Sequence, residues 1–354
     1  MTVGETVLEV EGLRVEFPTD DGIVRAVRGV SFGLGRGEVL GIVGESGSGK
    51  SVASLAVMGL LPGSARISGS VRFGDAELLG ATDKALSQVR GRRISMIFQD
   101  PMTSLNPVYT IGYQIAEAIR AHHDVSKEAA LEQAVELLDL VRIPNPRERL
   151  RSYPHELSGG MRQRVVIAIA MANRPDVIIA DEPTTALDVT VQAQILEALD
   201  TAKRETGAAM VLITHDLGVI AGQADRVLVM YAGKLVEAGT ADDIFYAPRM
   251  PYTLGLLGSL PRLDVKTERL TPIGGAPPSV VNMPPGCPFT PRCPLSQQVC
   301  EHEEPAAEPT TSPDHLAACH FSEQLEGREP GDLFGADWRD EAAAPAAERR
   351  EDAR

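Results

Sequence analysis

Gly44-Glu45-Ser46-Gly47-Ser48-Gly49-Lys50-Ser51 is the segment from which the architecture of this chain can be deduced. It satisfies every fixed position of the phosphate-loop pattern G-x-x-x-x-G-K-[ST]. A strand-like apolar run at residues 39–43 precedes it, and a helix-like run at residues 52–58 follows it. The alternative is a plain Gly/Ser turn, which these flanks and the later motifs disfavour. The segment therefore predicts a nucleoside-triphosphate site.

Each residue type in this loop has a physical role in such a site. Glycine lets the backbone curl so that successive N–H groups point at phosphate oxygens. The helix that follows presents its positive end to the same charge. We expect Lys50 to reach the outer phosphates and the Ser51 hydroxyl to take one position around Mg²⁺.

Size and charge limit the class of protein. The 354 residues can bury a substantial core, and no apolar run reaches the ~20 residues that a membrane-spanning helix needs. Residues 1–5 lack the basic and apolar parts of a signal peptide, so we expect a soluble, cytosolic protein. The net charge is −15, and residues 301–354 carry −10 of it, with 15 acidic and 5 basic residues. This acidity argues against nucleic acid as a partner.

Hydrophobic periodicity predicts an alternation of strands and helices. Strands are expected at residues 8–17, 23–32, 67–73, 94–98, 177–180, 210–214 and 227–231, with a hairpin turn at 20–22. Helices are expected within residues 111–140, 165–172 and 189–205. This order indicates an α/β fold with a largely parallel sheet. Prolines exclude long helices after about residue 260, and an acidic tail from Glu323 onward is expected to be disordered.

Polar side chains follow several of the predicted strands. Asp181 and Glu182 end an apolar strand, and the natural interpretation gives Asp181 to Mg²⁺ and Glu182 to the attacking water as general base. An exposed acidic turn before Pro183 is the alternative. His215 and Gln99 also follow strands, but a lone His or Gln at a strand end is uninformative by itself.

A second glycine-rich helix start lies far from the first. Ser158, Gly159 and Gly160 open the helix predicted around residue 165, and such a start can bind an anion. A plain capped helix is the simpler interpretation. A spare phosphate-binding helix end makes sense if it faces the nucleotide of another subunit.

Together these residues resemble the ATP-binding-cassette (ABC) ATPase family over about residues 7–245. The resemblance implies a P-loop NTPase fold with a RecA-like core, an antiparallel β subdomain and a helical subdomain. Residues 44–51 would be the Walker A loop, Asp181 and Glu182 the Walker B pair, and residues 157–161 the cassette signature. The family binds ATP with Mg²⁺ between two cassettes that close head to tail, so one chain alone should be a poor ATPase.

The resemblance also assigns the family's other functional positions to single residues of this chain. Gln99 matches the Q-loop, where the family also places a magnesium contact, and His215 matches the switch histidine. Ala186-Leu187-Asp188 matches the D-loop. Phe17 stands where the family stacks an aromatic ring on adenine, although no sharp motif fixes it.

Residues 99–107, 158–164, 252–253 and 276–320 look like the dipeptide/oligopeptide importer branch, which includes some nickel importers. This branch implies a partner ATPase subunit, two membrane-spanning permease subunits and an extracytoplasmic substrate-binding protein, with the chain held peripherally on the cytoplasmic face of the membrane. The chain departs from this branch at Met250: the residue before Pro-Tyr-Thr is usually His in the branch. A nickel importer, a soluble cassette protein acting on ribosomes or DNA, and an export ATPase are the alternatives.

All four cysteines lie in one tenth of the chain. Cys287, Cys293, Cys300 and Cys319 have spacings x5, x6 and x18, without the CxxC pair of common zinc sites. Two disulfides, four free thiols and a four-thiolate metal site are the three interpretations. Cys-Pro pairs are similar to those of cluster proteins, and the resemblance implies a 4Fe-4S cluster, with Zn²⁺ as the alternative.

The predicted organisation has three parts. Residues 5–260 would form the nucleotide-binding domain, residues 261–322 a small Cys/Pro-rich C-terminal domain, and residues 323–354 the acidic tail. The predicted function is ATP hydrolysis that powers the uptake of di- or oligopeptides.

Overall fold

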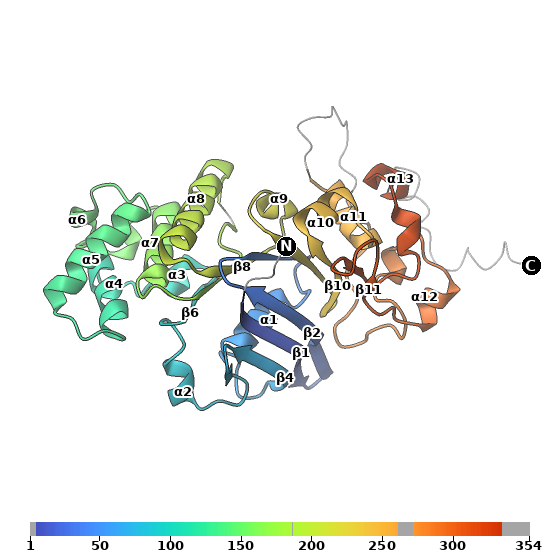
Figure 1. Cartoon of the computed structure of the whole chain (residues 1–354), viewed down its shortest axis with the longest axis horizontal. Coiled ribbons are helices and arrows are strands. Elements are labelled where there is room, and N and C mark those ends of the chain that lie inside the picture. The colour runs from blue at the N-terminus through green and yellow to red at the C-terminus, as the bar shows by residue number, and fades with distance from the viewer. Residues whose placement is uncertain (1–4, 186, 261–271, 335–354) are drawn as a thin grey trace, which may run out of the picture.

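The computed structural model describes residues 5–185, 187–260 and 272–334. Two sheets organise the chain, with a layer of helices at one end and the C-terminal segment at the other (Figure 1). The strands are β1 Thr6–Thr19, β2 Gly22–Gly35, β3 Val39–Val43, β4 Arg66–Phe73, β5 Ala76–Glu77, β6 Ile94–Ile97, β7 Val177–Asp181, β8 Ala209–Thr214, β9 Arg226–Tyr231, β10 Lys234–Thr240, β11 Glu308–Pro309 and β12 Leu316–Ala317.

The helices are mostly short. They are α1 Lys50–Val57, α2 Asp83–Ser87, α3 Pro101–Ser104, α4 Ile111–Arg120, α5 Lys127–Leu140, α6 Pro146–Arg149, α7 Gly159–Met171, α8 Val189–Thr206, α9 Leu217–Ile220, α10 Ala241–Tyr246, α11 Pro251–Gly258, α12 Gln298–His302 and α13 Pro330–Phe334. Short 3-10 helices cover Pro154–Glu156, Thr290–Arg292 and Ser322–Leu325. The strands and helices expected from periodicity are all present.

The main sheet has the order β11-β12-β10-β9-β3-β8-β7-β6. Its centre is parallel, as predicted, because β3 pairs in parallel with β8 and β9, and β7 with β6 and β8. Every residue of β3, β7 and β8 is buried. Continuous apolar runs are what a parallel sheet covered on both faces requires. The carboxyl ends of β3, β6, β7 and β8 consequently lie at one edge, where the site forms.

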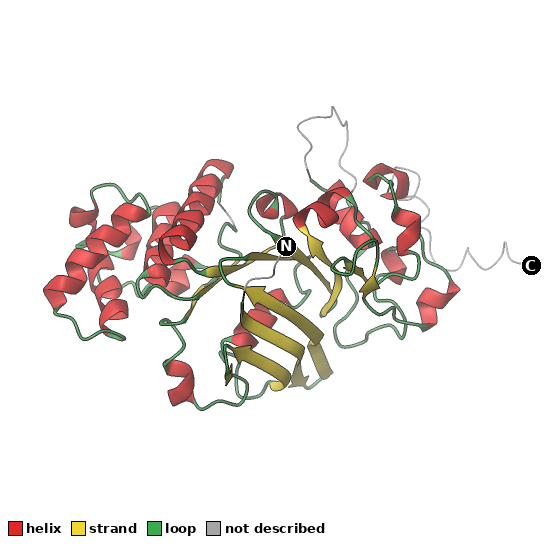
Figure 2. Cartoon of the chain, viewed as in Figure 1, coloured by secondary structure: helices red, strands yellow, loops and turns green. Residues whose placement is uncertain are grey.

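The smaller sheet is antiparallel, in the order β2-β1-β4-β5. The long hairpin β1–β2 turns at Asp20 and Asp21, as the sequence predicts. Its inward residues share a core with α1 and the near face of the main sheet. This sheet therefore braces the helix that follows the phosphate loop, and it lies below the main sheet in Figure 2.

The helical layer is built from α4, α5, α6 and α7. Helix α4 buries Ile111, Ile115 and Ile119, a four-residue repeat that places them on one face. Thr110 and Ser126 cap the N-termini of α4 and α5 by accepting backbone N–H groups. Within the layer, α4 packs against α5 and α7, and the buried residues of these three helices belong to one core.

The C-terminal segment shares the main sheet and its core. Strand β12 pairs with β10, and β11 pairs with β12. Phe289, Leu325 and Phe334 are buried in the same core as the helices on the sheet. The C-terminal segment is therefore packed into the core of the preceding residues, and this packing continues past Glu323, where the sequence predicts a disordered tail. Apolar anchors at Leu325, Leu333 and Phe334 explain this difference. The expected boundary at residue 261 and the tail beyond residue 334 lie outside the described residues.

Among the residues that the structure describes, no helix combines the length and the apolar character needed to cross a bilayer.

Candidate nucleotide site

The phosphate loop joins β3 to α1 in a conformation that requires glycine. Gly44 has φ +151°, and a Cβ there would lie 2.2 Å from the backbone oxygen of Met230. Gly49 has φ +98°, and its Cβ would lie 2.3 Å from the backbone oxygen of Ala26. Backbone atoms of β9 and β2 thus pack directly against the loop, so its curvature is fixed by its surroundings as well as by its glycines.

Lys50 is folded into the loop. Only 4% of it is exposed, and its Nζ donates to the backbone oxygens of Gly44 at 2.6 Å and Glu45 at 3.1 Å. Burial lowers the pKa of Lys50, although the nearby carboxylates of Glu182, Asp181 and Glu45 oppose that shift. The ammonium group therefore lies where a phosphate oxygen would compensate its lost hydration.

Ser51 and Asp181 meet at the end of β7. The Ser51 hydroxyl donates to Asp181 Oδ1 at 2.9 Å. Asp181 is 5% exposed, and burial raises its pKa, while the Ser51 hydrogen bond opposes that shift. A hydroxyl and a buried carboxylate side by side are hard oxygen ligands of the kind that Mg²⁺ prefers. These two residues therefore fit the magnesium ion that the sequence predicts.

Three other side chains contact the Glu182 carboxylate. Its Oε2 accepts from Thr185 Oγ1 at 2.8 Å and Gln99 Nε2 at 3.2 Å, and His215 Nδ1 lies 3.2 Å away. Among the described residues no hydrogen bond reaches Oε1. Glu182 also has φ +47°, a conformation that is costly for a residue with a Cβ and that is found at functional sites. The arrangement leaves one carboxylate oxygen free to accept a proton.

These residues line one cavity of about 490 Å³. Its lining consists of residues 45–52 together with Gln99, Glu182 and His215. The structure therefore brings together side chains that the sequence analysis selected from four separate stretches. Phe17 does not line this cavity; it lies near the end of β1, opposite Val24.

The second glycine-rich helix start lies elsewhere on the chain. Ser158 caps α7 by accepting from the N–H of Met161 at 3.3 Å, and Gly159 and Gly160 form its first turn. Asp188 caps α8 in the same way at Val191. None of these residues lines the cavity at the phosphate loop. Ala186, the first residue of the predicted D-loop, lies outside the described residues.

Two residues at the site escaped the sequence analysis. Thr185 binds Glu182 from only three positions along the chain, so this spacing after a strand-end carboxylate could have indicated it. Arg292 binds the Glu45 carboxylate from 247 positions away, and no local pattern could have indicated that contact.

The four cysteines line a second, much smaller cavity of about 20 Å³. All four are free thiols, so the disulfide alternative is wrong for this structure. Burial raises the pKa of Cys293 to about 12 and that of Cys319 to about 11. Within the described ranges, no group of three or more Cys, His, Asp or Glu side chains is placed to hold a metal ion. The predicted 4Fe-4S or zinc site is therefore not supported by this geometry.

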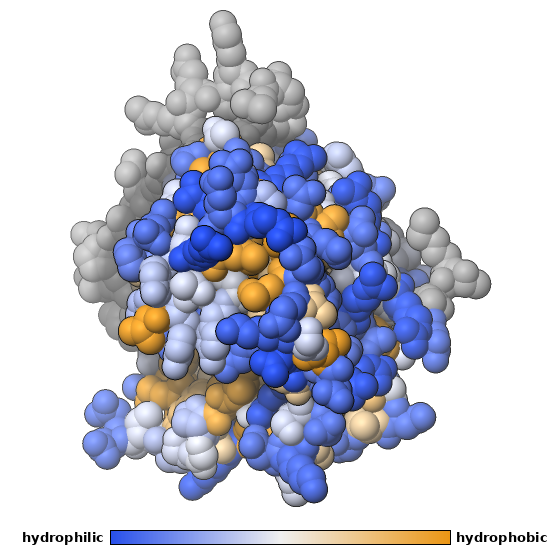
Figure 3. Space-filling view, turned by 90° about the vertical axis from the view of Figure 1, so that its left-hand side faces the viewer, coloured by the Kyte–Doolittle hydropathy of each residue, from blue (hydrophilic) through white to orange (hydrophobic). Residues whose placement is uncertain are grey.

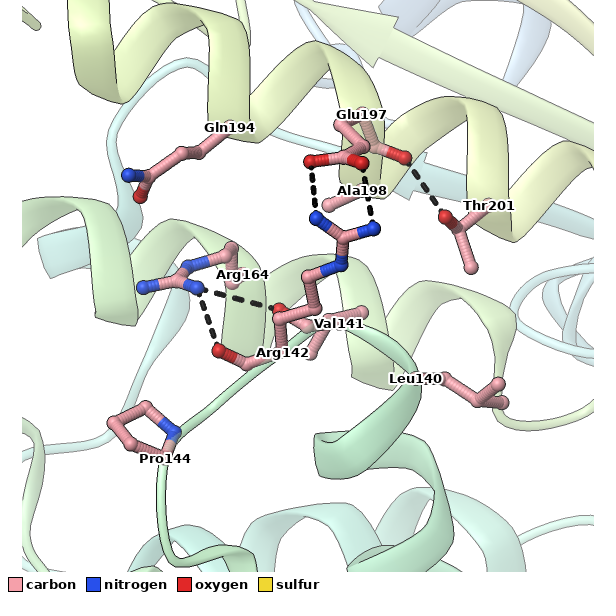
Figure 4. Close-up of a pocket in the computed structure, with 9 residues that line it drawn as sticks. All are labelled: Leu140, Val141, Arg142, Pro144, Arg164, Gln194, Glu197, Ala198 and Thr201. Atoms are coloured by element: carbon pink, nitrogen blue, oxygen red, sulfur yellow. Dashed lines mark hydrogen bonds and ion pairs between the residues drawn. The ribbon is translucent and has the colours of Figure 1, made fainter.

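Another cavity, of about 360 Å³, lies between the end of α5, α7 and α8 (Figure 4). Its charged side chains already have partners, because Arg142 binds Glu197 at 2.7 Å and Arg164 donates to the backbone oxygen of Arg142 at 2.7 Å. None of the predicted site residues lines it. The cavity at the phosphate loop is therefore the better candidate for an anionic ligand.

Comparison with known protein families identifies two segments. Residues 27–185 match the family described as ABC transporter, and residues 236–300 match the family described as oligopeptide/dipeptide transporter, C-terminal region. The first match begins in β2 and ends just after Glu182. It therefore contains the phosphate loop, the capped start of α7 and the Glu182 cluster except for His215.

Several curated relatives are similar over most of the chain. The dipeptide transport ATP-binding protein DppD of Bacillus subtilis is 54% identical over 322 residues, which cover 90% of this chain and 96% of that protein. The oligopeptide transport ATP-binding protein OppD of Escherichia coli is 52% identical over 315 residues, covering 89% of this chain and 93% of that protein. OppD of Mycobacterium bovis is 57% identical over 92% of this chain, which spans only 54% of that relative.

Solved structures of similar fold are ABC cassettes. The dimeric post-hydrolysis structure of the cassette MJ0796 bound to ADP and Pi has a TM-score of 0.59 and 27% identity. It covers 66% of this chain and 98% of that chain. The structure of cbiO1 from Clostridium perfringens, part of the complex cbiONQ, has a TM-score of 0.59 and 26% identity, covering 69% of this chain and 92% of that one.

Proposed function

Since this chain belongs to the ABC transporter family, among the ATP-binding proteins of oligopeptide and dipeptide transporters, we propose that it hydrolyses ATP to power peptide uptake. One observation carries this proposal: Lys50, Ser51, Gln99, Glu182 and His215 line a single cavity around the phosphate loop. These are the groups that binding a triphosphate and activating a water require.

Binding would begin with the loop and Lys50. Phosphate oxygens would join the backbone oxygens of Gly44 and Glu45 as acceptors from the Lys50 ammonium group. Ser51 and Asp181, already in contact, would hold Mg²⁺ together with Gln99. The ion would neutralise charge on the outer phosphates. Phe17 is proposed to stack on adenine at the outer end of the site.

Hydrolysis would depend on Glu182. Its Oε1 would accept a proton from the attacking water, while Oε2 remains held by Thr185, Gln99 and His215. Fixing one oxygen orients the other without consuming its acceptor capacity. His215 would also hydrogen-bond the terminal phosphate.

A second ATPase chain would complete the site. The helix start at Ser158, Gly159 and Gly160 does not line this chain's own cavity, and Asp188 lies at another helix start. We propose that both face the nucleotide of a partner cassette, identical or homologous, when the two chains close head to tail. The partner would contribute the same groups in return. The resulting pair would reopen after hydrolysis.

The surface that would contact the two membrane-spanning permease subunits follows Gln99. Met102 is 53% exposed and Val108 70%, and exposed Tyr109 and Tyr113 stack with ring centroids 4.6 Å apart. On the molecular end built by α4, α5 and α6, apolar residues form separate small patches among hydrophilic ones (Figure 3). Exposed apolar side chains gathered along one short segment favour an interface. We propose that the chain sits there on the cytoplasmic face of the membrane, with an extracytoplasmic binding protein supplying the peptide.

We also propose that the four cysteines take up a 4Fe-4S cluster, with Zn²⁺ as the alternative. The supporting observations are that all four are free and share one cavity. Their side chains would have to rotate, and binding would have to displace protons from buried thiols. Anaerobic purification should give brown protein containing iron and sulfide. Colourless protein with one zinc per chain would instead support zinc.

Glu182→Gln tests the proposed activity. The amide keeps the size of the side chain but is a far weaker base, so hydrolysis should fall by about 10²–10⁴-fold while ATP binding persists. The variant pair should stay closed and elute as a dimer with ATP. Wild-type turnover in this variant would remove Glu182 from its role. Purification of the tagged chain from detergent-solubilised membranes should bring permease subunits with it.

A further inference from the structure

The acidic side chain of the phosphate loop is held from the C-terminal segment. Arg292 Nη1 lies 2.7 Å from Glu45 Oε2, and Nη2 lies 2.8 Å from Oε1. This two-point contact is the strongest geometry available to an arginine and a carboxylate. Arg292 is 4% exposed and the Glu45 side chain 27%, so the pair is partly shielded from solvent.

Arg292 is itself fixed in position. Its Nε donates to the backbone oxygen of Gly274 at 2.9 Å, and its Nη1 donates to the Tyr231 hydroxyl at 3.2 Å. The guanidinium carbon lies 5.8 Å from the ring centroids of both Tyr231 and Phe289. Because these contacts fix the Arg292 guanidinium within its own segment, a shift of that segment would also shift the Glu45 carboxylate that Arg292 binds.

The backbone of Glu45 is held by the same cluster. Its N–H donates to the Tyr252 hydroxyl at 2.8 Å, and Tyr252 packs against Tyr231 with ring centroids 4.5 Å apart. The remaining polar group of Glu45, its backbone oxygen, accepts from Lys50 Nζ at 3.1 Å. Every polar group of Glu45 therefore has a partner, and one of them is the phosphate-binding lysine.

We propose that Arg292 is a positioning residue of the nucleotide site, which acts through Glu45 on the phosphate loop and on Lys50. Arg292 lies between Cys287 and Cys293, so the conformation of the cysteine segment would set the affinity for nucleotide. This inference rests on the proposed function, since it assumes that the loop binds ATP. It assigns the C-terminal segment a part in ATP binding.

A second contact of the C-terminal segment, with β2 and β10 and not with the phosphate loop, provides the control. Glu304 binds Arg28 at 2.9 Å and Lys234 at 2.7 Å, and none of these residues lines the nucleotide cavity. Glu304→Gln therefore weakens the attachment of the C-terminal segment without touching the loop. A purely structural role for Arg292 would make the two substitutions equivalent.

The test is titration of the full chain with a fluorescent ATP analogue, alongside its melting temperature. Arg292→Met should raise Kd by about ten-fold or more, from the loss of a charge-assisted contact. Arg292→Lys should recover part of the affinity. Glu45→Gln should also raise Kd and add little in the Arg292→Met background, because both remove the same interaction. Glu304→Gln should keep Kd within about two-fold while changing the melting temperature.

Two results would overturn the inference alone. One is a wild-type Kd in both Arg292→Met and Glu45→Gln. The other is an equal loss of affinity in Glu304→Gln. If Arg292→Met does not fold, Glu45→Gln decides, because it keeps the shape of the side chain. Failure of the wild-type chain to bind the analogue would overturn the proposed function and this inference with it.

Discussion

Replacement of Thr185 by valine tests how the site orients its general base. Valine keeps the branched shape of threonine but removes the hydroxyl that donates to Glu182 Oε2 at 2.8 Å. Two contacts would remain, from Gln99 and His215, each at 3.2 Å. The lost bond is the shortest of the three, so Thr185→Val should loosen the carboxylate more than either other single loss.

The size of the effect follows from the energy of that bond. A hydrogen bond to a charged group contributes about 1.5–3 kcal/mol, and the two remaining contacts can compensate part of it. A net loss of about 1.4 kcal/mol in the transition state corresponds to a ten-fold lower kcat. KM for ATP should stay nearly constant, because Thr185 does not line the phosphate-loop cavity.

The assay is steady-state ATP hydrolysis by the chain purified with its membrane partners. Thr185→Ser is the matched control, since it restores the hydroxyl and should recover most of the wild-type kcat. The reasoning is refuted if Thr185→Val keeps kcat within about two-fold of the wild type. Equal losses in the serine and valine variants would also refute it.

Three further substitutions test other parts of the structure. Lys50→Ala should weaken nucleotide binding by about ten-fold or more, measured by titration with a fluorescent ATP analogue. Gly286→Ala should release the cysteine segment to limited proteolysis, because a Cβ there would lie 2.1 Å from the backbone oxygen of Cys300, whereas Gly63→Ala meets open space and should not. Glu237→Gln should lower the free energy of unfolding by about 2 kcal/mol in chemical denaturation, because buried Glu237 accepts from the Met250 N–H at 3.1 Å and its Oε1 lies 2.8 Å from His315 Nε2. Burial also raises the pKa of Glu237. Wild-type stability should therefore contain a component that is lost as pH rises from the ordinary glutamate pKa through the raised one, and Glu237→Gln should lack it.

The sequence predicts those features that depend on neighbours along the chain. Strand and helix periodicity, the curled loop at residues 44–51 and the capped helix start at Ser158 are local, and the structure contains each of them. The gathering of Gln99, Glu182 and His215 was also predictable, because parallel strands place their carboxyl ends at one edge. The contact of Glu45 with Arg292 was not, because nothing in either segment encodes the other's position. The same applies to β12, whose two residues join the main sheet beside β10.

The two sides of the nucleotide site differ in how completely their groups are packed and hydrogen-bonded. Behind the loop, backbone atoms of Ala26 and Met230 leave no room for a Cβ, and Arg292 and Tyr252 hold Glu45. In front, Glu182 Oε1 lacks a hydrogen-bond partner among the described residues, and the helix start at Ser158 lies outside the cavity. Binding energy is therefore available within one chain, whereas in the proposed function a partner cassette would complete the closure over the terminal phosphate. It follows that nucleotide affinity should respond to substitutions behind the loop, and turnover to the concentration of the partner cassette.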